Sequence, residues 1–224
     1  MTTVANIVNP NLANQLDTGS WLEKGFRELG YDIRTTADRK ASGDITIVHG
    51  PNYALRGSKG LVLWLDRCWY GNKDEWVSLG WKLDNGARAF ATGDENRLLQ
   101  HIDTGIVEIE PMRHEGKTIA LDDFAQTVRA SGMLHDTYRG HPAREKHTTT
   151  LHGAMLGHQF AVCGSGTCAA QAKLAGLHVL CLDPSNIVHS KLSRWAWACE
   201  LAWTQWHRRE IESGKALRCL LDIL

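Results

Sequence analysis

The stretch FAVCGSGTCAAQAKLAGLHVLCLDPSN, from Phe160 to Asn186, carries the clearest pattern of the fold. An apolar run leads directly into the turn Gly164-Ser165-Gly166-Thr167, after which small residues such as Ala169 and Ala172 begin a predicted helix. A second apolar run, LHVLCLD, follows that helix. Strand, helix and strand in this order predict a βαβ unit, whose two strands lie parallel in one sheet.

The same alternation continues toward both ends of the chain. Short apolar runs rich in β-branched residues are separated by amphipathic stretches, which is the pattern of a sheet covered by helices. Strands are expected at 3–8, 31–36, 44–50, 60–66, 76–81, 87–93, 117–121, 137–140, 159–163 and 178–182, and helices at 21–30, 122–132, 148–156 and 165–176. We therefore predict an α/β fold with parallel sheets, and 224 residues suit either one large domain or two small Rossmann-like lobes, of which we take the second.

The periodicity is weakest between residues 96 and 116, which we take as the boundary between the lobes. The expected organisation is an α/β lobe at 1–105, a second α/β lobe at 106–190, and terminal helices at 191–224. Much of the tryptophan set in this tail is expected to share one helical stripe that packs against a core. The tryptophans of the tail are Trp195, Trp197, Trp203 and Trp206.

Composition excludes several classes of protein. The chain has 25 basic and 25 acidic residues, which disfavours a nucleic-acid binder that relies on overall positive charge, although a local basic patch remains open. Six cysteines without a C-x-x-C pair are expected as reduced thiols of a cytoplasmic protein. No apolar run approaches the roughly 20 residues of a membrane span. The N-terminus lacks a signal-peptide pattern, and the histidines lack zinc-motif spacing.

The Gly164–Thr167 turn has the features of a phosphate-binding site. Glycines let a ligand approach the backbone, and the start of a helix offers unpaired N–H groups and a partial positive charge. The hydroxyls of Ser165 and Thr167 add hydrogen-bond donors. The alternative interpretation is a plain strand-to-helix turn with a Ser or Thr cap. The turn is neither a Walker loop nor a dinucleotide fingerprint, because the lysine and the third glycine are missing.

A second polar group follows the strand expected at 137–140. His141 comes at the end of this strand, and Arg139, Arg144 and Lys146 lie within five residues of it. Ligands of doubly wound sheets collect at the carboxyl ends of strands, where His141 and the glycine turn are both expected. A histidine and cations that face a helix N-terminus form a phosphate or diphosphate clamp. In the alternative interpretation, the histidine only ends the strand and the cations are solvated.

Together these motifs resemble a known family. A His-Pro pair at one strand end, a Ser/Thr-bearing G-S-G-T turn after the next strand and the segment AKLAGLHVLCLDP are similar to the donor lobe of GT-B glycosyltransferases. They are most similar to the sialyl- and Kdo-transferases of capsule and lipopolysaccharide synthesis. The resemblance covers Lys117 to Asn186. It implies a nucleotide-sugar-binding lobe at 106–190, an acceptor-side lobe at 1–105, and terminal helices at 191–224 that cross back to the first lobe.

The resemblance also implies roles for individual residues. In that family a histidine and a hydroxyl cluster hold the phosphate of the donor nucleotide, a role that passes to His141, Ser165 and Thr167. The family's general base is an acidic residue in a loop of the acceptor lobe that is rich in Asp and Glu. This sequence departs from the pattern, because it has no such loop.

Three residues of the first lobe are candidates for the base. Asp66 ends the most apolar strand of the first half, His49 ends another strand, and Asp17 lies in the long loop before the first helix. A carboxylate or an imidazole at such a position can take the proton of an acceptor hydroxyl. For each of them a plain turn or loop role is the alternative.

The resemblance thus predicts an enzyme, a glycosyltransferase that moves a sugar from a UDP- or CMP-sugar to a hydroxyl acceptor without a covalent cofactor or a required metal. The acceptor is a glycan or a hydroxymethyl-pyrimidine in DNA, since compact transferases that modify phage DNA bases suit the chain's size; such a phage enzyme acts in the host cytoplasm. The alternative is a non-catalytic nucleotide or nucleotide-sugar binder, which the missing acidic loop favours. An NAD or flavin enzyme is disfavoured, because the first strand–helix turn lacks a glycine fingerprint.

Overall fold

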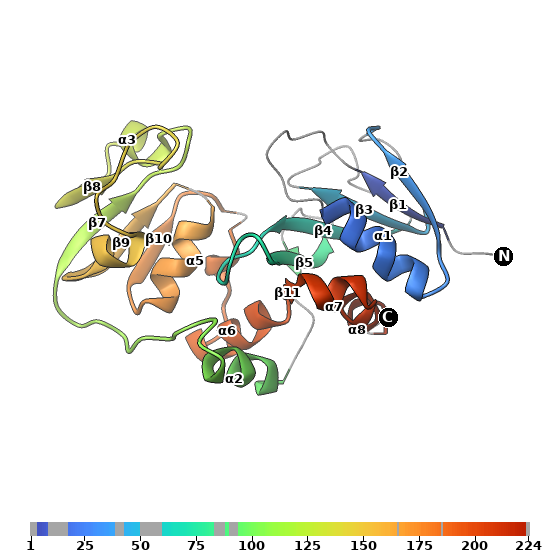
Figure 1. Cartoon of the computed structure of the whole chain (residues 1–224). Coiled ribbons are helices and arrows are strands. Elements are labelled where there is room, and N and C mark those ends of the chain that lie inside the picture. The colour runs from blue at the N-terminus through green and yellow to red at the C-terminus, as the bar shows by residue number, and fades with distance from the viewer. Residues whose placement is uncertain are drawn as a thin grey trace. The chain divides into compact units, whose positions relative to one another are not determined.

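The structure is a computed structural model that describes residues 4–8, 18–38, 43–49, 60–82, 88–89, 94–164, 166–184 and 186–222. The chain forms two compact units: unit 1 consists of residues 1–98 and 199–224, and unit 2 of residues 99–198. The chain passes into unit 2 within helix α2 (Asn96–Asp103) and returns to unit 1 within helix α6 (Arg194–Ala202) (Figure 1). None of the helices in the described ranges is long and apolar enough to cross a membrane.

Unit 1 contains a mixed sheet. Its strands are β1 (Val4–Val8), β2 (Asp32–Thr36), β3 (Ile45–His49), β4 (Leu61–Arg67), β5 (Trp76–Lys82), β6 (Arg88–Ala89) and β11 (Gln205–His207). Their order is β11-β5-β4-β3-β1-β2, and β6 also pairs with β5. Strands β1 to β4 are parallel, as predicted, whereas β5 is antiparallel to β4, β6 and β11. The connection at 68–75 is too short for a crossover helix, so β4 and β5 form an antiparallel pair.

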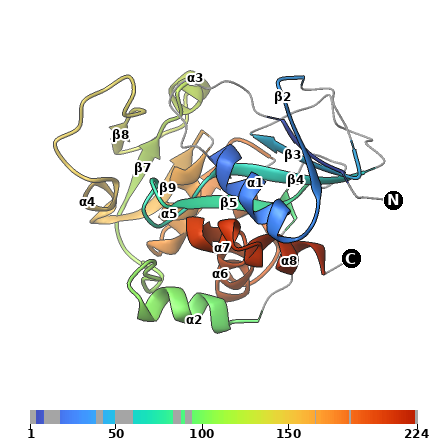
Figure 2. The same ribbon diagram turned by 45° about the vertical axis from the view of Figure 1, so that its right-hand side comes forward.

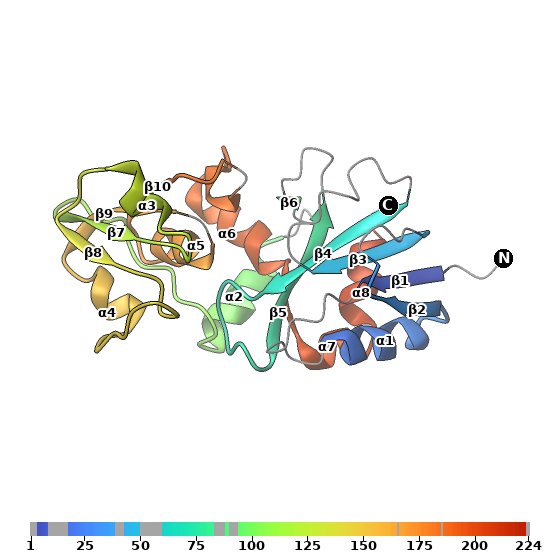
Figure 3. The same ribbon diagram turned by 90° about the horizontal axis from the view of Figure 1, so that it is seen from above.

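Three helices pack on one face of this sheet: α1 (Thr18–Glu28), α7 (Arg208–Glu212) and α8 (Lys215–Leu221) (Figures 2 and 3). The apolar stripe of α1 predicted from the sequence is buried, and its Trp21, Leu22 and Phe26 join one core with the strands. The sheet contributes Ala5, Ile7, Ile45, Ile47, Leu63, Leu65, Val77 and Leu79, and the terminal helices contribute Ile211, Ala216, Leu217 and Leu220. This core therefore combines the first and the last segments of the chain.

Helices α1 and α7 approach each other closely at Gly25. A Cβ atom at this position would lie 2.1 Å from the carbonyl oxygen of Ile211 and 3.1 Å from Leu217 Cδ1. We expect Gly25→Ala to lower the free energy of unfolding by about 1–3 kcal/mol, because the added methyl group forces the helices apart. The urea-unfolding midpoint measures this loss. Glu28→Ala, at an exposed position of the same helix, is the control and should leave the midpoint nearly unchanged.

Unit 2 contains a smaller sheet whose strands are all parallel. Its strands are β7 (Lys117–Leu121), β8 (Thr137–Arg139), β9 (His158–Cys163) and β10 (His178–Cys181), in the order β10-β9-β7-β8. All four were predicted as parallel strands, with ends that differ by no more than one residue. The predicted α/β class is thereby confirmed, with a parallel sheet in unit 2 and a mixed sheet in unit 1.

Helices cover both faces of the unit 2 sheet. Val128 of α3 (Thr127–Ser131) packs against Ala120 and Val162, and α5 (Thr167–Leu174) buries Ala169, Ala170 and Ala172. Two further short helices are α4 (Leu151–Met155) and η2 (Ile187–His189). Helix α3 is shorter than the helix predicted at 122–132, because the buried Asp122 carboxylate lies before it and accepts hydrogen bonds from the N–H groups of Val128 and Arg129.

The single tryptophan stripe predicted for the tail is wrong. Trp195 and Trp197 lie in α6, but Trp203 follows the helix and Trp206 lies in strand β11. Trp206 is fully buried, and its indole N–H donates to the carbonyl oxygen of Leu79 at 3.1 Å. The tail therefore contributes an edge strand to the unit 1 sheet as well as helices, and this strand interrupts the helical spacing.

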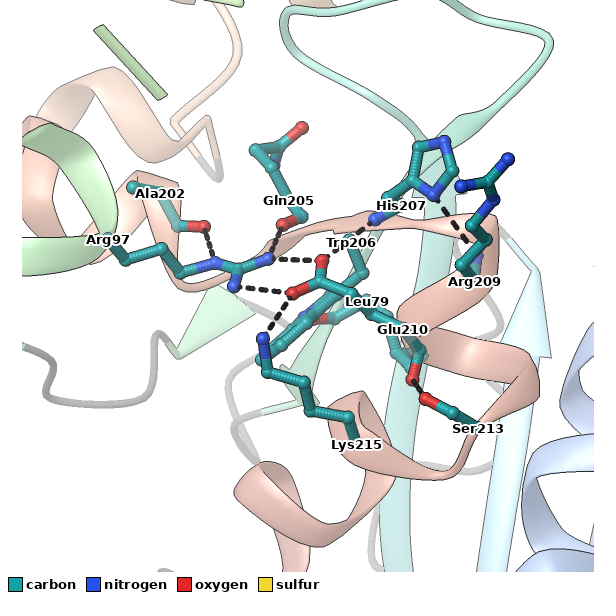
Figure 4. Close-up of polar contacts among 10 residues, drawn as sticks. All are labelled: Leu79, Arg97, Ala202, Gln205, Trp206, His207, Arg209, Glu210, Ser213 and Lys215. Atoms are coloured by element: carbon teal, nitrogen blue, oxygen red, sulfur yellow. Dashed lines mark hydrogen bonds and ion pairs between the residues drawn. The ribbon is translucent and has the colours of Figure 1, made fainter. Parts of the chain in front are cut away.

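A buried arginine organises the start of this tail (Figure 4). Arg97 donates to the carbonyl oxygens of Ala202 and Gln205, and both terminal nitrogens of its guanidinium bond the Glu210 carboxylate, at 3.0 and 2.8 Å. The guanidinium also lies 4.0 Å from the centroid of the Trp206 ring. This bidentate pair links α2 to α7 within unit 1 and satisfies the donors of a side chain that is only 5% exposed.

Glu210 is held in its charged form by this network. Burial alone would raise the pKa of Glu210, but the hydrogen bonds and charge of Arg97, with a hydrogen bond from Lys215, outweigh it and hold the pKa at about 2, against 4.5 for an ordinary glutamate. The charged carboxylate therefore stabilises the fold fully at a pH above its ordinary pKa of 4.5, and this stabilisation is lost as the pH falls toward its folded pKa of about 2.

We expect the stability difference between the parent protein and Glu210→Gln to shrink as the pH falls from about 5 to about 2, since the protonated glutamate then resembles the amide. Urea unfolding of both proteins across this pH range measures the difference. A stability difference that stays constant with pH would show that the pKa of Glu210 is the same in the folded and the unfolded protein.

Candidate functional site

The carboxyl edge of the unit 2 sheet gathers most of the residues singled out in the sequence. Because its four strands are parallel, the loops that follow β7, β8, β9 and β10 all leave from the same edge. Strand β7 lies between β8 and β9, so its loop stands between the histidine loop and the glycine turn. In open α/β sheets this edge is where ligands bind.

The glycine turn connects β9 to α5. Gly164 is buried, and its carbonyl oxygen accepts a hydrogen bond from the N–H of Asp183 at 3.1 Å. Gly166 occupies the N-cap position of α5 with a φ of 88°, a conformation that favours glycine and leaves no side chain to cap the helix. Thr167 lies half-buried in the first turn, and Ser165 lies outside the described residues. The start of α5 therefore presents backbone N–H groups beside a threonine hydroxyl.

The end of β8 and the loop after it carry the three cations and the histidine: Arg139 is the last residue of the strand, and His141, Arg144 and Lys146 follow in the loop. The Nδ1 atom of His141 accepts a hydrogen bond from the N–H of Ala143 at 3.2 Å, which leaves the proton of a neutral ring on Nε2. Arg139 donates to the side chain and the carbonyl oxygen of Thr149 at 3.3 and 2.8 Å, so these hydrogen bonds hold the end of the loop against the end of β8. Arg144 and Lys146 are exposed.

The dipeptide Asp123-Phe124, after β7, borders both motifs. The Phe124 ring meets the His141 ring edge-on at 5.8 Å between centroids, and the Arg144 guanidinium lies 4.3 Å from the centroid of Phe124. Asp123 lies so close to the glycine turn that a Cβ atom on Gly164 would come within 2.6 Å of its carboxylate. The loops that carry His141 and Gly164 thus share one neighbour.

Two residues of this edge were missed in the sequence. Asp123 caps α3, because its carboxylate accepts from the N–H of Thr127 at 3.0 Å and from its hydroxyl at 2.6 Å. Asn186, in the loop after β10, is buried and donates from Nδ2 to the carbonyl oxygen of Gly166 at 3.2 Å. Both follow the end of a predicted strand, which is the signal that would have identified them. Asn186 fixes the glycine turn from the β10 side.

The three candidates for the base belong to unit 1. Asp66 lies near the carboxyl end of β4, half-buried, and one oxygen of its carboxylate accepts from the N–H of Arg67 at 2.7 Å. His49 is the last residue of β3 and pairs in register with Leu65, so it lies near Asp66 in sequence register at the carboxyl ends of two neighbouring parallel strands; β4 itself ends one residue later than predicted, at Arg67. Asp17 lies outside the described residues. Asp66 and His49 are thus on a different unit from the phosphate motifs, near the carboxyl ends of parallel strands of the unit 1 sheet.

Among the residues that the structure describes, no group of three His, Cys, Asp or Glu side chains is placed to hold a metal ion. At the carboxyl ends of the unit 2 strands, several groups are hydrogen-bond donors. The donors are the backbone N–H groups at the start of α5, the Thr167 hydroxyl and the His141 ring.

The fold is shared with solved structures. The β-Kdo 2,7-transferase of Thermosulfurimonas dismutans KpsC matches with a TM-score of 0.58 and 10% sequence identity, over 96% of this chain and 99% of that one. The β-Kdo 2,4-transferase of the same KpsC matches with a TM-score of 0.52 and 10% identity, over 92% of each chain. No protein-family model and no curated protein matches the sequence. The two-lobed GT-B-like architecture expected from the sequence is therefore confirmed as a fold.

Proposed function

We propose that the protein is a glycosyltransferase that binds a nucleotide sugar at the carboxyl edge of the unit 2 sheet and transfers the sugar to a hydroxyl acceptor. The observation that carries this proposal is the arrangement at that edge, where the histidine loop and the glycine turn both border Asp123-Phe124. The shared fold with two Kdo transferases supports the same class of reaction.

In the proposed reaction, the acceptor oxygen attacks the anomeric carbon of the donor sugar and the bond from that carbon to the phosphate oxygen breaks. The nucleotide leaves with the electron pair, and its phosphate gains negative charge. The N–H groups at the start of α5, the hydroxyls of Ser165 and Thr167 and the Nε2–H of His141 stabilise this charge. Arg144 and Lys146 add positive charge from the same loop. A base in unit 1, Asp66 in our proposal, takes the acceptor proton.

The donor is proposed to be a UDP- or CMP-sugar, used without a covalent cofactor or a required metal. The acceptor is a glycan or a hydroxymethyl-pyrimidine of DNA, and a phage-encoded enzyme of the second kind would act in the host cytoplasm. All of these donors share a phosphate-linked nucleotide leaving group. The α5 N-terminus recognises that group in each case.

A thermal-shift panel of UDP-, GDP-, CMP- and TDP-sugars tests the donor site, because a ligand at 100 times its Kd stabilises a protein by about 2.7 kcal/mol. We expect one nucleotide class to raise the Tm, and His141→Ala to reduce that rise. Slow hydrolysis of the bound donor indicates a transferase, whereas an intact donor after prolonged incubation indicates the non-catalytic binder. The absence of any shift with all four classes would contradict both functions.

A further inference from the structure

Three thiols lie beneath the glycine turn. Cys163 ends β9 and is fully buried, and Cys181 is its register partner on β10. The Sγ atom of Cys181 lies 3.5 Å from the carbonyl oxygen of Gly164. Cys168, in the first turn of α5, is partly exposed, and its Sγ atom lies 4.0 Å from the carbonyl oxygen of Leu121. All of the cysteines are in the thiol form.

Cys163 and Cys168 are the two thiols of this group that interact directly through their side chains. Leu121 is the register partner of Cys163 on β7 and also the residue that Cys168 contacts, so both side chains converge on one point of the sheet. The two side chains hydrogen-bond to each other. They are separated in sequence only by the residues of the glycine turn. A covalent bond between them would therefore close a small ring that contains the backbone of the glycine turn, which is part of the proposed donor site.

The two thiols are chemically unequal. The hydrogen bond from Cys163 lowers the pKa of the Cys168 thiol, and the backbone N–H groups of Cys168 and Ala169 lower it further, against the opposing effects of burial and of the Asp123 charge. The pKa of Cys163 is raised well above its ordinary value by its hydrogen bond to Cys168 and by burial. Cys168 is therefore the nucleophile of the pair and Cys163 the resolving thiol.

We propose that Cys163 and Cys168 form a reversible disulfide that switches the donor site off, an inference that rests on the proposed function for its effect but not for its chemistry. The thiolate of Cys168 attacks one oxygen of hydrogen peroxide; an S–O bond forms, the O–O bond breaks, and the hydroxide that leaves takes a proton from solvent, which replaces the one that Cys168 released, to become water. The sulfur of Cys163 then attacks the Cys168 sulfenic acid; the S–S bond forms, the S–O bond breaks and a second water leaves with the proton of Cys163. A dithiol reductant reverses the reaction.

The short S–S bond of the disulfide is expected to change the conformation of the glycine turn. An S–S bond of about 2.05 Å is much shorter than a thiol hydrogen bond, so the first turn of α5 is drawn toward the end of β9. This movement breaks the contact between Cys168 Sγ and the carbonyl oxygen of Leu121, and it brings the start of α5 closer to Gly164. The N–H groups that are proposed to hold the phosphate then lose their spacing, and donor binding weakens.

Peptide mapping tests the disulfide independently of any donor. Trypsin cleaves after Lys146, Lys173 and Lys191, so Cys163 and Cys168 share the peptide 147–173 and Cys181 lies in 174–191. After treatment with hydrogen peroxide we expect peptide 147–173 to lose two hydrogen atoms and to resist alkylation until dithiothreitol is added. Alkylation of both cysteines, or a bond that joins 147–173 to 174–191, would overturn the proposal. Cys168→Ser should abolish the change, and Cys219→Ser, in unit 1, should not affect it.

The effect on the site is measured with the nucleotide sugar that most raises the Tm of the reduced protein. We expect peroxide to remove this rise, dithiothreitol to restore it, and Cys168→Ser to keep it under both conditions. An equal rise in the reduced and oxidised proteins would overturn the switch while leaving the proposed function intact. If no nucleotide sugar stabilises the reduced protein, the proposed function and the switch both fail, and the peptide map alone decides whether the disulfide forms.

Discussion

Replacing Asp66 by asparagine is expected to slow sugar transfer by about 10²–10⁴-fold, the usual loss when a general base is removed. The amide keeps the size of the carboxylate and its acceptor oxygen toward the N–H of Arg67, so the end of β4 should stay folded. Donor affinity should stay close to that of the parent protein, because the donor motifs belong to unit 2. Initial rates at saturating donor, with a thermal shift on the same protein, measure the two quantities.

His141→Ala is the matched contrast to this variant. It removes a proposed phosphate ligand, so we expect donor affinity to fall, with a smaller Tm shift at equal donor concentration. Transfer by Asp66→Asn at the parental rate would mean that Asp66 is only a turn residue. His49→Ala and Asp17→Asn would then be the next variants to measure.

Arg97→Ala is expected to lower the free energy of unfolding by about 3–5 kcal/mol, the cost of breaking a buried ion pair by removing one partner. The variant removes the bidentate partner of the Glu210 carboxylate, which keeps Lys215 as a cationic partner. It also removes the donors to Ala202 and Gln205 and uncovers the Trp206 ring. Chemical denaturation measures the loss. Arg208→Ala is the control: Arg208 also pairs with a glutamate, Glu212, but its side chain is 48% exposed, and such pairs contribute about 1 kcal/mol at most.

A double variant separates charge from shape in this cluster. When both partners of a buried ion pair are replaced by apolar side chains of similar volume, the change is often neutral or stabilising. We expect Arg97→Met combined with Glu210→Leu to recover part of the stability lost in Arg97→Ala. If Arg97→Ala unfolds at the parental denaturant concentration, the pair contributes nothing and the core alone holds α2 in unit 1.

The sequence predicted most of the strands, because most of them are short apolar runs bounded by turn residues. In unit 2 the alternation of strand and helix also determined the direction of the strands, since a crossover helix makes them parallel. The same reasoning could not place β11, because QWH is too short to show an alternating pattern. Its position depends on pairing with β5, from Gln205 opposite Ser78 to His207 opposite Trp76, and such long-range pairing leaves no local signal.

The sequence predicted the motifs of the candidate site but not how they are arranged in space. His141 and the Gly164–Thr167 turn were identified because strand ends are favoured binding positions, and these roles stay predictions. The link between their loops was not visible, because it passes through Asp123 and Phe124, which were assigned to a helix. Two adjacent aspartates directly after a predicted strand are better explained as caps, since their carboxylates satisfy N–H groups at the start of α3.

The division of unit 1 into two segments has a consequence for biosynthesis. A ribosome makes the residues of unit 2, which form one continuous stretch, before it makes residues 199–224, which supply β11, α7 and α8 to unit 1. Domains generally fold as units while the chain is still being made. All of unit 2 is therefore available to fold once it has left the ribosome, whereas unit 1 keeps an incomplete sheet edge and an uncovered face until residues 199–224 have also emerged.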